Sequence, residues 1–578
     1  TGSWKNNVCF VADDGSNADG YMIQHAQQAD DLGEYINTSH PEFMVNKIYF
    51  DSYKKDFSGG LSTYPDVKTN LQKQLKNGLL LINYTGHGNT VSWSDEKVLT
   101  ESDITKSTYT RLPVWITATC DFCRFDAPVT SAGEQVFLNK VSGGIGLFTT
   151  TRVAYSSPNF SINDNLIRNL FEKKNGRRLT LGEVMKATKQ ALGSSRYKLG
   201  FALIGDPALK LAYPEYRMRV TAINGNPVTD EPIDFKALQK ITVEGEVLDP
   251  GGNIATGFNG LLNPTVMDSR LSYETLDNNK TGTKFKYTDY SNILFIGNDS
   301  VRAGKFSFTF TVPKDISYSN EFGKMNLYAS DETNNLEAQG AYLNYRVGGT
   351  DDNAEDDYDG PEIRALYLND STFVSGDQVN TTPFFVARLW DKSGVNITGS
   401  SIGHDMMLII DGDPSFSFNL NSYYELIPGS DGEGIAKYLI PALTPGIHTA
   451  EFKVWDIQNN STTYEFEFEV VEGLKPYLLE LTASPSPARE QVEFHLFHNR
   501  PESQLTVGIM VYDMMGRLQW KHQETGASEL FKSYTVTWDL TNNRGGRLRP
   551  GVYIYRAAIS SSGSKEATDA KKLIILAQ

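Results

Sequence analysis

The hydrophobic pattern of the chain changes near residue 213, and this change limits the fold more than any other feature. Before that residue, short apolar runs alternate with segments of helical period. Apolar strands alternating with helices predict a mainly parallel sheet covered on both faces. After Tyr213 the helical period stops, and short alternating strands follow with turn signals such as Asp249-Pro250-Gly251-Gly252. This second pattern is typical of β-sandwiches.

The first region is expected to be an α/β domain. The pattern predicts strands at 8–13, 45–50, 79–84, 113–119 and 145–150, and helices at 22–36, 67–75, 133–140, 162–173 and 181–192. Ligands of an open parallel sheet bind beyond the carboxyl ends of its strands. We therefore look for functional side chains directly after these strands.

The whole chain is expected to contain several domains, because 578 residues exceed the ~100–200 of a typical one. We predict domains at 1–213, 214–350, 351–473 and 474–578. Residues 248–257 resemble residues 390–399, which favours two related sandwiches in the middle of the chain. The acidic segment 349–360 does not have EF-hand spacing, so we interpret it as a solvated linker. We expect no cofactor, and a structural calcium ion stays open.

Composition excludes several classes of protein. The net charge is −16 and no Lys/Arg cluster stands out, so nucleic acid is not an expected partner. No apolar stretch reaches the ~18 residues that cross a bilayer. The amino-terminal residues show no signal-peptide pattern, which indicates a processed, truncated or cytosolic chain. Abundant Gly, Tyr, Phe, Asn and Ser favour extracellular β-rich modules, and three cysteines are too few for a disulfide framework.

One histidine and one cysteine follow neighbouring strands of the predicted sheet. His87 stands between two glycines in NYTGHGN, just past strand 79–84, and Cys120 ends strand 113–119. If these strands are adjacent, the two side chains meet at one sheet edge. A Cys–His pair is the minimum for thiol nucleophilic catalysis. The N–H groups of Gly88 and Cys120 are then candidate oxyanion donors.

Each of these residues also has an ordinary interpretation. A glycine-flanked histidine is usually a turn residue, and a cysteine at a strand end is usually a small buried hydrophobe. Their coincidence in one α/β domain favours catalysis. Cys120 and Cys123 also form a C-x-x-C pair, but no second pair exists, so redox or zinc chemistry ranks below peptidase chemistry. We expect Cys9 to be a core residue, and we expect His25 and His40 to be structural.

Other polar residues follow the strands at the same edge. Asp13 and Asp14 follow the first strand, and one of them is a candidate to orient the His87 imidazole. The alternative is a plain hydrophilic loop. Trp93, Asp95, Arg152 and Tyr155 lie in loops of this edge and are candidate residues of the substrate cleft.

The amino-terminal motifs resemble those of the gingipain-type cysteine peptidases. NYTGHGN, then Cys120 in ITATCDFCRFD, then FALIGDPALKL at 201–211 match that family in order. The resemblance implies a caspase-like α/β fold, with His87 as the catalytic histidine and Cys120 as the nucleophile. The fold class expected for the chain is therefore multidomain: a caspase-like peptidase domain followed by all-β immunoglobulin-like sandwiches.

The last hundred residues resemble a type IX secretion C-terminal domain. SPSPA, VYDMMGRLQW, WDLTNNRGGRLRPGVYIYRA and KKLIIL carry this resemblance. With the peptidase motifs, they resemble the sortases of type IX secretion, which implies a location at the bacterial outer-membrane surface. The implied partners are the C-terminal domains of secreted cargo, an anionic lipopolysaccharide acceptor and an outer-membrane β-barrel. The alternatives are an ordinary gingipain-like secreted protease and a non-catalytic surface adhesin.

Overall fold

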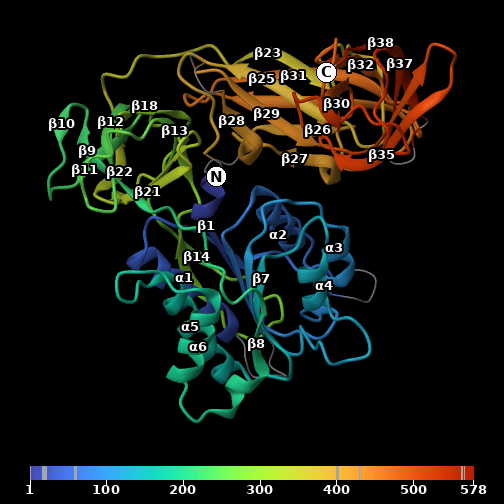
Figure 1. Cartoon of the computed structure of the whole chain (residues 1–578). Coiled ribbons are helices and arrows are strands. Elements are labelled where there is room, and N and C mark those ends of the chain that lie inside the picture. Colours follow the sequence, from blue (N-terminus) through green and yellow to red (C-terminus); the bar gives the residue numbers. More distant parts are fainter. Residues whose placement is uncertain are drawn as a thin grey trace. The chain divides into compact units, whose positions relative to one another are not determined.

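The computed structural model describes residues 2–15, 23–57, 62–398, 403–427, 430, 432–561, 564 and 566–577. The chain forms two compact units (Figure 1). The first comprises Thr1–Val312 and Ile316–Asp352, and the second comprises Pro313–Asp315 and Asn353–Gln578. The four domain boundaries given above stay a prediction. No helix among the described residues is long and apolar enough to cross a membrane.

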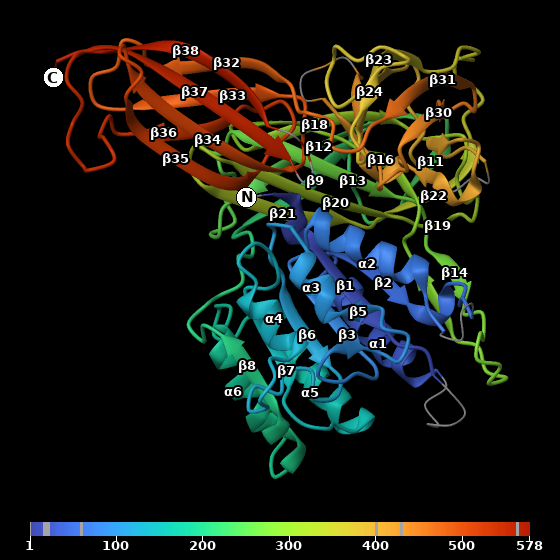
Figure 2. The same cartoon turned by 90° about the vertical axis from the view of Figure 1, so that its right-hand side faces the viewer.

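A six-stranded sheet forms the centre of the α/β region (Figure 2). Its strand order is β2-β1-β3-β6-β7-β8, with all neighbours parallel except β7 and β8. The bounds are β1 Asn7–Ala12, β2 Met44–Tyr49, β3 Leu81–Thr85, β6 Val114–Ala118, β7 Gly146–Thr150 and β8 Phe201–Gly205. The mainly parallel sheet expected from the apolar runs is therefore present, and its antiparallel edge strand β8 was not predicted.

Alternate residues of β1 pack in two separate cores, because successive side chains of a strand point to opposite faces of the sheet. Val8 and Phe10 pack in one core with residues of α1 (Gln24–Ser39), α5 (Ser156–Phe171) and α6 (Leu181–Ala191). Cys9 and Val11 pack in the other core with α2 (Pro65–Asn77), α3 (Glu101–Lys106) and α4 (Ala132–Leu138). Cys9 is fully buried, as expected. Residue 22, at the predicted start of α1, lies outside the described residues.

The remainder of the first unit is all β. A nine-stranded sheet and a three-stranded sheet enclose one apolar core. The larger sheet contains β9 Tyr216–Ile223, β10 Asn226–Pro227, β12 Lys240–Leu248, β13 Gly260–Met267, β16 Ile293–Ile296, β17 Asp299–Arg302, β18 Lys305–Thr311, β20 Lys324–Asp331 and β21 Leu336–Tyr342. The smaller contains β11 Ile233–Ala237, β19 Glu321–Phe322 and β22 Tyr345–Thr350. A hairpin of β14 Leu271–Glu274 and β15 Lys286–Asp289 packs against the α/β region.

The second unit contains two further pairs of β-sheets, each pair around its own core. One sheet of the first pair contains β23 Glu362–Leu368, β25 Phe384–Trp390, β28 Tyr424–Leu426 and β29 Gly434–Leu439. The other sheet contains β24 Gln378–Val379, β26 Met407–Ile410, β27 Ser417–Asn419, β30 Gly446–Trp455 and β31 Ser461–Val470. One sheet of the second pair contains β32 Leu478–Ser484, β33 Val492–His498 and β36 Tyr534–Trp538. The other sheet contains β34 Gln504–Asp513, β35 Leu518–Ala527, β37 Gly551–Ser561 and β38 Ala567–Ile575. The predicted change from α/β to all-β architecture is thus confirmed.

A buried lysine joins the α/β region to the β-sheets of the first unit. Lys324 of β20 donates hydrogen bonds to the Phe43 carbonyl at 2.6 Å and to Asn37 Oδ1 at 3.2 Å. Burial lowers the pKa of Lys324 to about 8. The folded state therefore releases the Lys324 proton near pH 8, while the unfolded chain keeps it to about pH 10.5.

We predict that Lys324 makes the protein more stable as the pH rises from about 8 to about 10. In this window the unfolded state binds more protons, so a higher pH favours folding. Urea unfolding at both pH values should show the free energy of unfolding of wild type rising relative to Lys324→Met. Lys305→Met, at an exposed position on β18, serves as the control. An equal gap between wild type and Lys324→Met at both pH values would contradict the prediction.

Candidate active site

The parallel pairing of β3 and β6 brings His87 and Cys120 to the same edge of the sheet. Thr85 pairs with Ala118 in the last register position of these strands, and each functional residue follows two positions later. His87 and Cys120 line one cavity of about 140 Å³ together with His25, Thr119, Ala154 and Asn159. The structure therefore brings the predicted pair together.

Cys120 lies on a tight turn. Its Sγ is 3.4 Å from the donating N–H of Ala154 and 3.3 Å from the Ala154 carbonyl oxygen. The next residue, Asp121, has φ of 50°, and its N–H donates to the Arg152 carbonyl. Non-glycine residues seldom adopt this left-handed conformation, and such residues cluster at functional sites. The turn leaves Cys120 half-buried at the cavity wall.

Cys123 has a different environment. Its side chain is fully buried, and a Cβ on Gly133 would lie 2.7 Å from the Cys123 Cβ. Burial and the nearby Glu134 raise the pKa of the Cys123 thiol to about 11. Both cysteines are free thiols. A buried thiol with a raised pKa forms little of the reactive thiolate, so Cys123 is poorly suited to act as a nucleophile.

The backbone of His87 is held from both sides. Its N–H donates to Asp13 Oδ2 at 2.9 Å, and its carbonyl accepts from the Tyr84 hydroxyl at 2.7 Å. Its ring packs edge-on against the ring of His25, with centroids 5.2 Å apart. His25 was expected to be structural, but α1 places it in the same cavity. Its sequence position inside a helix gave no signal of this.

Asp13 and Asp14 contact groups other than the His87 imidazole. Asp13 is buried, and its carboxylate accepts the backbone N–H groups of His87 and Asp14. Burial, followed by the charges of Asp14 and Glu96, raises the pKa of Asp13 well above its usual range. Among the described residues, no ion pair links either carboxylate to the His87 ring. Asp13 thus positions the backbone of the histidine loop, and an orienting role of Asp13 or Asp14 toward the imidazole stays a prediction.

Asp14 is engaged by three donors. Its Oδ2 accepts from Lys55 Nζ at 2.8 Å, from the Tyr64 hydroxyl at 2.7 Å and from Asn279 Nδ2 at 2.7 Å. Asn279 belongs to the β14–β15 hairpin, so the β-sheet region of the first unit contributes to the base of the histidine loop. This long-range contact has no signal in the local sequence.

The glycines beside His87 are required by close packing. A Cβ on Gly86 would lie 2.3 Å from the Asp13 Cβ, and a Cβ on Gly88 would lie 2.5 Å from Thr119 Oγ1. Neither glycine has a positive φ, so crowding, and not backbone conformation, explains them. Within the described residues, no acceptor takes the amide hydrogen of Gly88 or Cys120. The role of these two N–H groups as oxyanion donors stays a prediction.

The structure places the four candidate cleft residues in different environments. Trp93 is fully buried and stacks on Tyr84 at 4.2 Å, so its predicted place in the cleft is wrong. Asp95 is exposed and lines neither this cavity nor the one beside it. Arg152 and Tyr155 line the neighbouring cavity, and Arg152 pairs with Asp126 at 2.6 Å. The bulky indole of Trp93 fills the core because an apolar ring gains most there.

Two groups of carboxylates among the described residues could hold a cation. Asp13, Asp14 and Glu96 form one group, but Lys55 already pairs with Asp14 and Glu96. Asp357, Asp391 and Asp456 form the other, with ligand oxygens within 4.8 Å of one another. Asp357 comes from the acidic segment interpreted above as a linker. Oxygen ligands suit calcium, and the structural calcium ion stays a prediction.

Comparison with known proteins finds one family model that matches the α/β domain. Residues 1–212 match the model of peptidase family C25. The match indicates a cysteine peptidase, and the matched residues include both His87 and Cys120. The expected resemblance to gingipain-type peptidases is thereby confirmed for this region.

Two solved structures are among those similar to the chain. Dimeric latent PorU from Porphyromonas gingivalis is 26% identical, with a TM-score of 0.33, and the match covers 99% of this chain and 65% of that one. The Arg-specific cysteine proteinase gingipain R is 18% identical, with a TM-score of 0.31, covering 60% of this chain and 67% of that one. The chain thus spans less than two thirds of the latent PorU chain. No curated protein matches the sequence.

Proposed function

We propose that the chain is a gingipain-like cysteine endopeptidase with Cys120 as nucleophile and His87 as base. The observation that carries this proposal is that both side chains line one cavity at the carboxyl edge of the sheet, within the residues that match peptidase family C25. His87 accepts the thiol proton, and the Cys120 sulfur attacks the scissile carbonyl. The N–H groups of Gly88 and Cys120 donate to the oxyanion.

The reaction then proceeds through a thioester. The tetrahedral intermediate collapses, the C–N bond breaks, and the leaving amine takes the proton from His87. The Cys120 sulfur now carries the new carboxyl end as an acyl group. A second nucleophile, water or an amine, attacks this thioester and restores the thiol. Water gives hydrolysis, and an amine gives transpeptidation.

We further propose that the enzyme acts as a surface sortase of type IX secretion. It removes C-terminal sorting domains from cargo and transfers the new carboxyl end to an amine on anionic lipopolysaccharide. Residues 474–578, which resemble a type IX C-terminal domain, would hold the enzyme on an outer-membrane β-barrel. The likeness of the peptidase and C-terminal motifs to the type IX sortases supports this finer assignment, as does the order of the motifs along the chain.

The test is a reaction of the purified protein with a cargo protein that keeps its C-terminal sorting domain. The reaction is run with and without an amine acceptor, and the products are weighed as intact proteins. An amine adduct at the new carboxyl end supports the sortase. Hydrolysed product alone favours an ordinary secreted protease, and uncut cargo would remove the support for this substrate class.

A further inference from the structure

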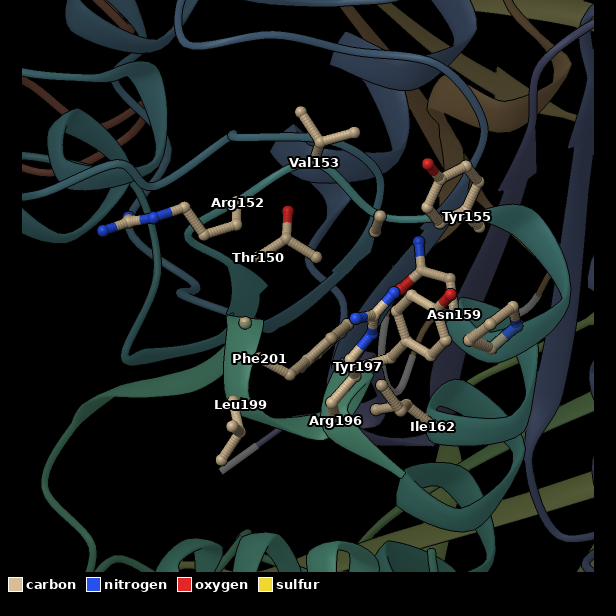
Figure 3. Close-up of a pocket in the computed structure, with 13 residues that line it drawn as sticks. Thr150, Arg152, Val153, Tyr155, Asn159, Ile162, Arg196, Tyr197, Leu199 and Phe201 are labelled. Carbon is tan, nitrogen blue, oxygen red and sulfur yellow. The ribbon is translucent and has the colours of Figure 1, made fainter. Parts of the chain in front are cut away.

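Figure 3 shows a second cavity, of about 340 Å³. It shares Ala154 and Asn159 with the cavity that His87 and Cys120 line. Ala154 lies against the nucleophile, since its N–H and carbonyl both contact Cys120 Sγ. A substrate carbonyl at Cys120 therefore has its neighbouring side chains beside this second cavity, which we call the side-chain pocket.

The walls of the side-chain pocket are mostly apolar. They come from the end of β7, the loop after it, α5, the 3-10 helix Arg196–Gly200 and the start of β8. The apolar and aromatic lining residues are Val153, Ala154, Tyr155, Pro158, Ile162, Tyr197, Leu199 and Phe201. Several are exposed in the absence of a ligand, including Leu199 at 74% and Val153 at 66%. Exposed apolar side chains grouped around a cavity mark a place where apolar surface is buried on binding.

The charged residues of the pocket are cations. Of the described residues that line it, only Arg152 and Arg196 carry charge. Arg152 pairs with Asp126, whereas Arg196 lies over the ring of Tyr197 at 5.5 Å. Figure 3 shows Arg196 and Tyr197 together on one wall, with Ile162 near them. A lysine or arginine side chain entering the pocket would meet like charge and would have no carboxylate partner in its lining.

The wall between the two cavities carries an acceptor without a donor. Asn159 is only 6% exposed, and its Oδ1 has no hydrogen-bond partner. A buried acceptor left without a donor is costly, and such groups are rare in folded proteins. A peptide N–H of a bound substrate would satisfy it. The position of Asn159 on both cavities suits a substrate backbone that passes from one to the other.

We propose that the side-chain pocket binds a large apolar side chain, preferably aromatic, next to the scissile bond and rejects lysine and arginine. This proposal rests on the peptidase function above. Arg196 supplies the exclusion of cations, the apolar walls supply the affinity, and Asn159 Oδ1 accepts a backbone N–H of the substrate. The pocket thereby determines which peptide bond reaches Cys120.

The test uses the full chain carrying Cys120→Ala, which binds peptides without cutting them. Labelled peptides are identical except that Phe, Leu, Glu or Arg replaces one position at a time, and fluorescence anisotropy gives each Kd. We expect the best phenylalanine peptide to bind about tenfold more tightly than its arginine partner. Equal affinity for the two peptides at every position would overturn the proposal.

Reversing the charge of Arg196 provides the decisive experiment. Arg196 is exposed, so Arg196→Glu is compatible with folding. In the Cys120→Ala background it should shift the ratio of the two Kd values toward the arginine peptide by about tenfold. Lys186→Glu makes the same charge change on an exposed position of α6 and should leave the ratio unchanged. An equal shift in both variants would show a general charge effect and refute a role for Arg196.

A third variant separates the contribution of the apolar wall to peptide binding from the contribution of the Arg196 charge. Tyr197→Ala should weaken binding of the phenylalanine peptide and leave the arginine peptide unaffected. Because binding is measured without the nucleophile, failure of this inference is distinct from failure of the peptidase proposal. The latter would show as absent turnover by wild type, whatever the ratio of Kd values.

Discussion

Replacing Cys120 with alanine should reduce kcat/KM for peptide cleavage by roughly 10⁴–10⁶-fold. The reason is that the thiolate forms the covalent intermediate, and no other described residue of the cavity carries a thiol. The Cys120 side chain is half-buried at the wall, so its loss leaves the core intact. Thermal unfolding should therefore stay near that of wild type while activity is lost.

Cys123→Ala is the matched control for this prediction. Cys123 is fully buried, so its truncation should cost about 1 kcal/mol of stability and leave turnover close to that of wild type. Activity is measured with a fluorogenic peptide, and stability by thermal unfolding. If Cys123→Ala loses turnover and Cys120→Ala keeps it, the nucleophile has been assigned to the wrong cysteine.

Replacing His87 with alanine should lower kcat/KM by roughly 10²–10⁴-fold, because the proton of the thiol then has no positioned acceptor. The rate of Cys120 alkylation by iodoacetamide should fall as well, since the thiolate is the species that reacts. The alkylated site is identified by mass spectrometry of the digested protein. Both readouts follow the Cys–His pair itself and do not depend on the identity of the natural substrate.

His25→Asn is the comparison variant, because His25 lines the same cavity and contacts the His87 ring edge-on. We expect it to change turnover much less than His87→Ala does. A larger loss in His25→Asn, with normal alkylation of Cys120 in His87→Ala, would assign the base to His25. Thermal unfolding of both variants shows whether either loss comes from the fold.

Much of the α/β domain was predictable because its signals are local. The apolar runs of β1, β3, β6 and β7 and the helical period of α2 and α6 appear in short windows of sequence. α3 was missed, although Thr100 and Asp103 form a capping box that marks its start. β8 was missed because a short, half-buried edge strand has a weak pattern.

The site was predictable only in part, because some of its contacts join residues that are far apart in the sequence. His87 and Cys120 could be placed together because parallel strands end at one edge, and strand order follows from few alternatives. The burial of Trp93 depends on Tyr84 and the surrounding core. The contact of Asn279 with Asp14 joins residues far apart in the chain. No local pattern encodes such pairs.

The sequence by itself determined most strands and helices of the α/β domain, the change to all-β architecture and the pair of side chains that can perform thiol chemistry. Periodicity and the edge rule of parallel sheets are sufficient for these. Only the tertiary structure decided that Asp13 holds the His87 backbone, that crowding requires Gly86 and Gly88, and that an apolar pocket with Arg196 adjoins Cys120. These features arise from packing between distant segments, where shape and distance, and not residue pattern, set the outcome.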